Sequence, residues 1–106
     1  MKLSFYPEVK LELNTYNPIN PRENIPKSLI LHSTRNYSKF EDVLFKHKQK
    51  GWDGVGYHLF VDFEGKVFQA RPFDKEGAHA LGFNTSSIGI CVYSKNGILE
   101  PSKVKV

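Results

Sequence analysis

Runs of apolar residues divide the chain into short elements. The segments Ser28–Leu31 and Ser87–Tyr93 are continuous and apolar, which predicts two buried strands. Residues 57–63 alternate between apolar and polar positions, and residues 66–71 follow a Glu-Gly turn signal. These two segments are therefore expected to form a hairpin. Residues 3–13 alternate loosely, which fits either a strand or an extended arm.

A helix is predicted over residues 38–50. Ser38 and Glu41 have the spacing of a capping box, in which each side chain bonds a backbone amide of the first turn. Side chains then recur at helical spacing on one face: Phe40, Val43, Leu44 and His47. Gly51 stands where a left-handed cap ends a helix. The order strand, helix, hairpin, loop, strand predicts an α/β fold, a mixed central sheet with helical packing on it.

Composition narrows the class of protein. The 106 residues suit one domain, with 40% hydrophobic and 25% charged residues. The single cysteine, Cys91, rules out an internal disulfide, and no apolar run approaches the roughly 18 residues of a membrane span. Residues 1–13 lack the apolar stretch of a secretory signal, so we expect a product that is cytoplasmic on synthesis. The net charge of +4 suits an anionic partner, but dispersed lysines and no base-stacking motif argue against nucleic acid.

Three histidines are placed where an imidazole could serve a site. His32 ends the first apolar run, His58 lies in the hairpin, and His79 lies in a glycine-flanked loop. Each could hold a metal or a proton, or instead be a buried ring bonded to the backbone. Strand alternation sends His58 to the face opposite Tyr57. The fourth histidine, on the apolar helix face, and Cys91 are expected to be structural.

Three motifs occur in order: Gly-Trp-x-x-x-Gly-Tyr-His at 51–58, Gly-Ala-His-Ala-x-Gly-x-Asn at 77–84, and Ser-Ile-Gly-Ile at 87–90. Together with His32-Ser33-Thr34, they resemble the type 2 N-acetylmuramoyl-L-alanine amidases, a family that includes T7-type lysozymes and peptidoglycan recognition proteins. The resemblance runs from about residue 28 to residue 92. It implies binding of peptidoglycan or its muropeptides in the cell wall. It also implies zinc-dependent cleavage of the amide between the muramyl lactyl group and L-alanine.

The resemblance also assigns residues. His32 matches the first zinc ligand, and Tyr57 matches the tyrosine near the zinc that orients water or stabilises the oxyanion. His79 and Asn84 match the loop that contacts substrate. Arg71 matches an arginine after the hairpin, for which an ion pair fixing the hairpin is the alternative role.

The tail departs from the family pattern. There, a helix and a loop after the Ser-Ile-Gly-Ile strand carry a second histidine ligand and a cysteine or aspartate ligand, whereas residues 93–106 contain neither histidine nor cysteine. We therefore divide the domain into an arm and loop (1–27), an amidase core (28–93) and a tail (94–106), lacking the C-terminal helix. The expected consequence is an incomplete zinc site and little hydrolysis. A weak metal site formed by His32 and His79 is the local substitute.

Three functions remain open at this point. The chain is an amidase that is truncated or completed by another chain, a peptidoglycan recognition module without catalysis, or an interaction or inhibitory protein on the same fold. The missing helix would leave one apolar face of the sheet exposed. We expect that face to be covered by the N-terminal arm or, preferably, by a second copy in a homo-oligomer.

Overall fold

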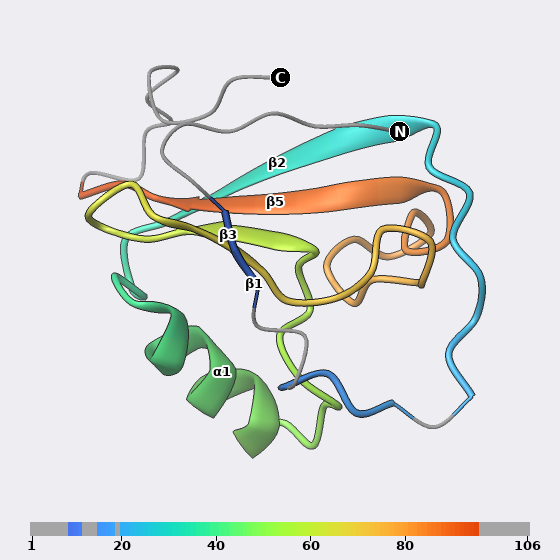
Figure 1. Ribbon diagram of the computed structural model, residues 1–106, viewed down its shortest axis with the longest axis horizontal. Coiled ribbons are helices and arrows are strands. Elements are labelled where there is room, and N and C mark those ends of the chain that lie inside the picture. The colour runs from blue at the N-terminus through green and yellow to red at the C-terminus, as the bar shows by residue number, and fades with distance from the viewer. Residues whose placement is uncertain (1–8, 12–14, 19, 96–106) are drawn as a thin grey trace.

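A mixed β-sheet with a helix on one face forms the centre of the molecule. The computed structural model describes residues 9–11, 15–18 and 20–95. Within them, the sheet has five strands in the order β1-β4-β3-β5-β2, and one helix crosses beneath it (Figure 1). The elements are β1 (Val9–Leu11), β2 (Ser28–Thr34), α1 (Phe40–Gln49), β3 (Leu59–Val61), β4 (Val67–Gln69) and β5 (Ser87–Tyr93). The predicted α/β fold is confirmed.

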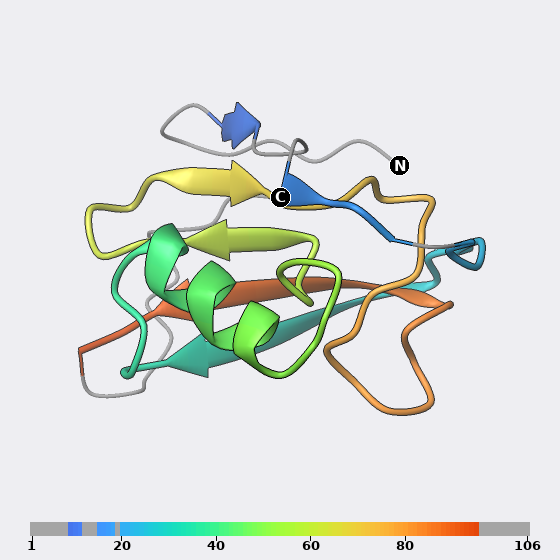
Figure 2. The same cartoon turned by 90° about the horizontal axis from the view of Figure 1, so that it is seen from below.

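Strand β5 lies between β2 and β3 and runs parallel to both, while β3 and β4 form the predicted antiparallel hairpin. Strand β1 adds a parallel strand at the far edge, beside β4 (Figure 2). The stretch 3–13, which fitted either a strand or an arm, thus contains a strand at Val9–Leu11, and the rest of it lies outside the described residues. No helix in the described part of the chain is long and apolar enough to cross a membrane.

The two faces of the sheet carry separate apolar clusters because successive strand residues point to opposite sides. On the helix side, Phe40 and Val43 of α1 pack with Phe60, Phe68 and Cys91. The opposite face is formed by aliphatic side chains, all at most 2% exposed: Leu59, Val61, Val67, Ile88, Ile90 and Val92. These side chains are buried, so the apolar face is not exposed to solvent. Whether the N-terminal arm or a second copy covers this face stays a prediction.

The helix starts later than the capping signal indicated. It begins at Phe40, and Lys39 is its extended N-cap residue with no side-chain capping bond, so the predicted capping box is wrong. The reason is tertiary: the Ser38 carbonyl accepts the amide of Phe63 from beyond β3, at 2.9 Å. Ser38 is thereby tied to the sheet one residue before the cap. The predicted C-terminal signal is confirmed, since Gly51 has φ of +82°.

Strand β2 differs from its predicted form in two ways. It continues past the predicted end through His32 to Thr34, and it forms an edge of the sheet, paired with β5. Leu31 is 51% exposed, so the prediction of a fully buried strand is wrong here. Its register places His32 beside Cys91 of β5. This pairing puts the histidine on the helix side of the sheet, where the site lies.

Candidate functional site

Three of the side chains singled out in the sequence converge. His32 comes from β2, Tyr57 from the segment before β3, and His79 from the loop between β4 and β5. The His32 ring centroid lies 5.2 Å from that of Tyr57 and 5.1 Å from that of His79, and the Tyr57 and His79 centroids are 6.4 Å apart. The structure therefore brings together residues that are up to 47 positions apart in sequence. They form one cluster on the helix side of β2 and β5.

The two histidines of the cluster contact each other directly. His32 Nε2 and His79 Nδ1 are 2.9 Å apart. On the far side of its ring, His79 Nε2 lies 3.3 Å from the Ser87 hydroxyl, which in turn donates to the Phe83 carbonyl at 2.7 Å. Burial lowers the pKa of both histidines, that of His79 to about 4, so the two rings are neutral at pH 7.

Two glycines make room for the His79 ring. A Cβ atom on Gly77 or on Gly89 would stand 2.5 Å from atoms of that ring, closer than real Cβ contacts allow. Gly89 is the glycine of the Ser-Ile-Gly-Ile motif, and Gly77 opens the loop motif. The motif glycines thus have a steric explanation, since the imidazole lies flat against backbone that carries no side chain.

Asn84 fixes the loop from within. Its side-chain oxygen accepts the backbone amides of His79 at 2.9 Å and of Ala80 at 3.0 Å. Its own carbonyl accepts the amide of Gly77 at 2.9 Å. Asn84 therefore positions the backbone that carries His79. The contact with substrate that the resemblance implied for Asn84 stays a prediction.

Tyr57 is held between the cluster and the core. Its hydroxyl shares a hydrogen bond with the thiol of Cys91, and burial raises the pKa of Tyr57 well above its usual value. The phenol therefore keeps its proton at neutral pH and can act as a hydrogen-bond donor rather than as a base. Burial also raises the pKa of Cys91 to about 11, so the prediction of a buried, unreactive thiol agrees with its environment.

His58 is a buried ring bonded to the backbone, which was one of the two alternatives left open by the sequence. Its position, however, differs from the expected one. It is fully buried, accepts the Gly89 amide on Nδ1 at 3.1 Å and lies 2.7 Å from the Lys75 carbonyl through Nε2. Its ring is nevertheless 5.8 Å from that of His79, so the predicted separation to an opposite face is wrong. Strict alternation fails because β3 begins only at Leu59.

His47 is structural too, as expected from its place on the apolar helix face. It is 5% exposed, and its Nδ1 accepts the amide of Gly56 at 2.9 Å. Its ring lies 4.5 Å from that of Trp52 and 5.7 Å from that of Tyr57, measured between centroids. His47 thereby supports the segment that carries Tyr57 into the cluster.

Arg71 ties three segments together. Its Nε donates to the Val55 carbonyl at 3.0 Å and its Nη1 to the Glu76 carbonyl at 2.7 Å, while the guanidinium lies 4.9 Å from the centre of the Tyr16 ring. The side chain is 5% exposed. Among the described residues, Arg71 is held by hydrogen bonds to backbone carbonyls and not by an ion pair. Its predicted role in substrate binding stays a prediction.

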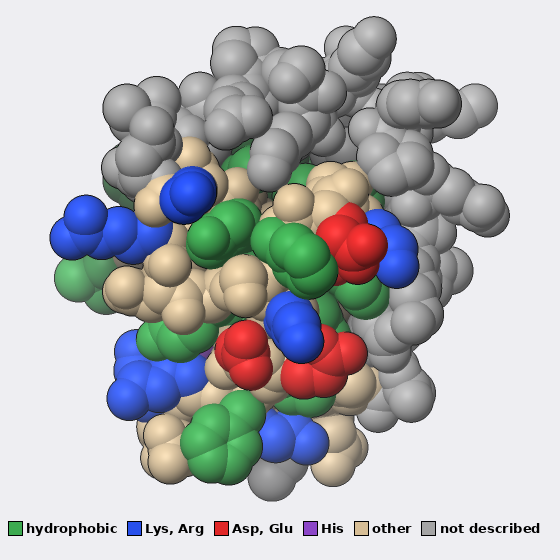
Figure 3. Space-filling view, turned by 90° about the vertical axis from the view of Figure 1, so that its left-hand side faces the viewer, with side chains coloured by type: hydrophobic (Ala, Val, Ile, Leu, Met, Phe, Trp, Pro, Cys, Tyr) green, Lys and Arg blue, Asp and Glu red, His purple; other side chains and the backbone are tan. Residues whose placement is uncertain are grey.

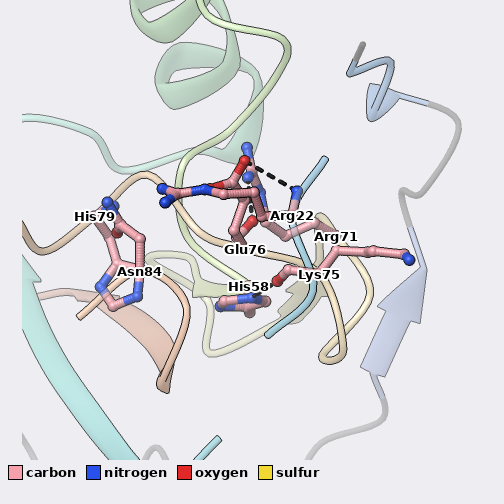
Figure 4. A network of polar contacts seen from close by, with 7 residues as sticks. All are labelled: Arg22, His58, Arg71, Lys75, Glu76, His79 and Asn84. Carbon is pink, nitrogen blue, oxygen red and sulfur yellow. Dashed lines mark hydrogen bonds and ion pairs between the residues drawn. The ribbon is translucent and has the colours of Figure 1, made fainter. Parts of the chain in front are cut away.

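Two ion pairs lie near Arg71. Arg22 pairs with Glu76 at 2.7 Å, and Lys75 pairs with Glu23. In Figure 4, the Arg22–Glu76 pair lies beside Arg71, with His79 and Asn84 to one side of it. The pairs join the loop around residues 22–24 to the loop before His79. The wall next to the histidine cluster is therefore fixed by contacts between segments that are distant in sequence.

A cavity of about 330 Å³ opens beside the loop that carries His79, with Gly77, Ala78 and Asn84 of that loop in its lining. Its wall includes two aromatic rings and several polar side chains: Tyr16, Trp52, Asp53, Arg71, Glu76 and Asn84. Sequence reasoning missed four of these wall residues: Tyr16, Trp52, Asp53 and Glu76. Trp52 and Asp53 belong to the motif at residues 51–58, so the motif could have pointed to them. Tyr16 lies in a loop rich in proline and asparagine, where no local pattern marks it.

The described residues do not supply a complete catalytic zinc site. No group of three or more histidine, cysteine, aspartate or glutamate side chains is arranged for metal binding in the described part of the chain. The cluster offers two imidazole nitrogens, whereas catalytic zinc in proteins takes three protein ligands. The expected incompleteness of the zinc site rests on residues 93–106, most of which lie outside the described residues, so it stays a prediction.

Comparison with known proteins identifies the family. The family model described as N-acetylmuramoyl-L-alanine amidase matches residues 21–104. The chain belongs to this family. The endolysin of Escherichia phage T7 is 44% identical to it over 46 residues, which are 43% of this chain and 30% of the endolysin. The resemblance to type 2 amidases noted in the sequence is thus confirmed.

Solved structures of the amidase and recognition-protein families share the fold. The amidase LysC from Clostridium intestinale URNW matches with a TM-score of 0.70 and 27% identity, over 83% of this chain and 60% of LysC. Peptidoglycan recognition protein-LE, solved in complex with tracheal cytotoxin, matches with a TM-score of 0.67 and 22% identity, over 81% of this chain and 59% of that protein. The chain therefore spans less than two thirds of the length of these amidase-fold relatives.

Proposed function

We propose that the chain binds peptidoglycan through the histidine cluster and the adjoining cavity, and that it acts as a recognition module of the amidase family. The observation that carries this proposal is the convergence of His32, Tyr57 and His79, of which His79 belongs to a loop whose residues 77, 78 and 84 line a cavity. The cluster offers two imidazoles, whereas a catalytic metal needs three ligands. Cleavage of the bond between the muramyl group and L-alanine would require ligands beyond those that the described residues supply.

The chemistry of the cavity supports a ligand built from sugar and peptide. Trp52 is 37% exposed at its wall and offers an aromatic surface for a pyranose ring or a peptide. Asp53 and the amide of Asn84 supply polar groups on the same wall. The net charge of +4 favours an anionic polymer over long range.

Two cluster residues present defined hydrogen-bonding groups. The Tyr57 hydroxyl keeps its proton because burial raises its pKa, so it is a neutral hydrogen-bonding group at pH 7. His79 is neutral at pH 7 because burial lowers its pKa to about 4. Neutral donors and acceptors recognise amides and hydroxyls, the groups that a muropeptide presents, without the cost of burying a charge.

A matched pair of variants tests the binding surface. Trp52→Ala and Phe63→Ala each remove one partly exposed aromatic ring, 37% and 47% exposed respectively. Phe63 belongs to the β3–β4 turn, at the opposite end of the sheet from the His79 loop (Figure 1). Figure 3 shows that end, where charged and hydrophobic side chains are interspersed. In co-sedimentation with insoluble peptidoglycan, Trp52→Ala is expected to bind about tenfold more weakly and Phe63→Ala like the wild type.

Two outcomes contradict the proposal. If the wild-type chain does not sediment with peptidoglycan, or if both variants lose binding equally, the cavity is not the binding surface. The same samples, analysed by mass spectrometry, are expected to release no peptides that begin with L-alanine, with or without added zinc. Robust release that a chelator abolishes would show a working amidase and would overturn the recognition role.

A further inference from the structure

A second cavity, of about 580 Å³, opens next to Trp52. The cavity beside the His79 loop has about 330 Å³, and both volumes fall within the range of pockets that hold small molecules. The two cavities share part of their lining: Tyr16, Gly51, Trp52 and Asp53. The cavities therefore adjoin, and residues 51–53 form a wall that is common to both.

The second cavity lies on the side of this common wall that is away from the His79 loop. Residues 77, 78 and 84 of that loop line only the first cavity. The second cavity is completed instead by residues from the chain before β2 and from α1: Thr15, Asn17 and Lys48. A ligand that extends from the His79 loop through the first cavity therefore reaches the second cavity next.

Backbone contacts hold the common wall against the segment at residues 15–17. The Asn17 amide donates to the Asp53 carbonyl at 3.2 Å. Gly54 permits this close approach, because a Cβ atom at that position would stand 2.8 Å from the Thr15 carbonyl oxygen. The wall of the second cavity is thus already in place, and a ligand that fills it loses little affinity to reorganisation of the protein.

The second cavity presents side chains of both charges. Lys48 supplies an ammonium group and Asp53 a carboxylate, and both residues are exposed. The Lys50 ammonium lies 5.0 Å from the centre of the Trp52 ring, which adds a second positive charge beside the common wall. A ligand with separate carboxylate and amino groups matches this arrangement, whereas an uncharged glycan uses neither charge. Peptide stems carry such groups.

We propose that the second cavity takes a second stem peptide, so that the chain binds cross-linked peptidoglycan more tightly than a single muropeptide. Neighbouring stems in peptidoglycan are joined through their peptides, so a second stem continues where the first one leaves the first cavity. The Lys48 ammonium then binds a carboxylate of this second stem. The proposal rests on the recognition of peptidoglycan proposed above and adds the class of ligand that the same site prefers.

The test compares two purified muropeptides by isothermal titration calorimetry: a disaccharide-tetrapeptide monomer and its cross-linked dimer. The dimer offers two stems, so statistics alone make its binding about twofold tighter. The wild-type chain is expected to bind the dimer about tenfold more tightly than the monomer, because only the dimer adds a charge-assisted bond to Lys48. Lys48→Ala should reduce this preference to about twofold and leave the affinity for the monomer unchanged.

Lys46→Ala is the matched control. It removes the same charge from α1, but Lys46 is not part of the lining of either cavity, so the preference for the dimer should persist. A wild-type preference of only about twofold would overturn the second subsite and leave peptidoglycan recognition standing, and this measurement needs no variant. A tenfold preference that Lys48→Ala leaves intact would overturn it as well. Failure of the wild type to bind either muropeptide would instead overturn the proposed function, and this extension with it.

Discussion

His58 and His79 lie in contact, yet they belong to two different regions of the molecule. Their ring centroids are 5.8 Å apart and their planes meet at 77°. His58 is fully buried, and its ring nitrogens bond the backbone of Gly89 and of Lys75. His79 is half-buried, and its ring nitrogens face the side chains of His32 and Ser87. His58 belongs to the buried interior next to the site, and His79 belongs to the surface of the site.

This contrast teaches how the same residue type acquires different functions. A ring bonded to backbone is released only when the sheet opens, so His58 contributes to the stability of the fold. A ring bonded to side chains can exchange those partners for a ligand at small cost. Arg71 belongs with His58 by this criterion, because its hydrogen bonds go to the carbonyls of Val55 and Glu76.

The largest expected effect comes from removing the sealed ring. His58→Ala leaves a cavity and two unpaired backbone groups, so the free energy of unfolding should fall by about 3 kcal/mol or more. His79→Ala exposes its former partners to water and should cost about 1 kcal/mol. Urea denaturation of both variants measures the difference. Equal losses of unfolding free energy in the two variants would contradict the distinction between a buried structural histidine and a histidine of the site surface.

Gly89 lies between the two regions and tests both at once. Its amide bonds the His58 ring, and a Cβ atom at this position would stand 2.5 Å from the His79 ring. Gly89→Ala should therefore displace the His79 imidazole and cost about 1–3 kcal/mol through overpacking. Histidine NMR should show a larger shift for His79 than for His47. An unchanged His79 signal would mean that the ring does not lie on the glycine.

A smaller effect is expected in the pH dependence of stability, through His47, whose ring also bonds the backbone. The pKa of His47 is lowered from 6.5 to about 4 by burial and by the nearby charges of Lys50 and Arg71. The unfolded state therefore binds more protons, and the stability contribution is complete above pH 6.5 and is lost as the pH falls toward 4. His47→Gln should show a shallower decline in unfolding free energy over this range. An identical slope would show that His47 does not resist protonation in the folded protein.

The smallest effect is expected at the outer ion pair. Arg22 and Glu76 form a hydrogen-bonded pair in which the arginine side chain is 71% exposed. Solvent screens such pairs, so Arg22→Ala should change the free energy of unfolding by less than about 1 kcal/mol. A loss of unfolding free energy as large as that of His58→Ala would show that this ion pair is part of the buried structural region. Thermal unfolding at low and high salt separates screening from packing.

Local patterns in the sequence were sufficient for several features. Apolar runs and turn signals predicted β5, the β3–β4 hairpin and the helix, because strand and helix periodicity depend on neighbouring residues. The spacing of the three motifs pointed to His32, Tyr57 and His79, and to the amidase family. The helix start was predicted wrongly, because a contact with Phe63 outweighed the capping preference of Ser38.

The order of the strands, and with it the site, was decided by tertiary structure. Only the pairing of β2 with β5 sets His32 beside Cys91, and only the fold of the β4–β5 loop brings His79 to within hydrogen-bond distance of His32. The role of each histidine depends on the atoms that surround its ring. For His79 and His58 they include atoms from segments far away in the chain, those of His32 and of Gly89. Sequence periodicity carries no information about such contacts, because packing decides them.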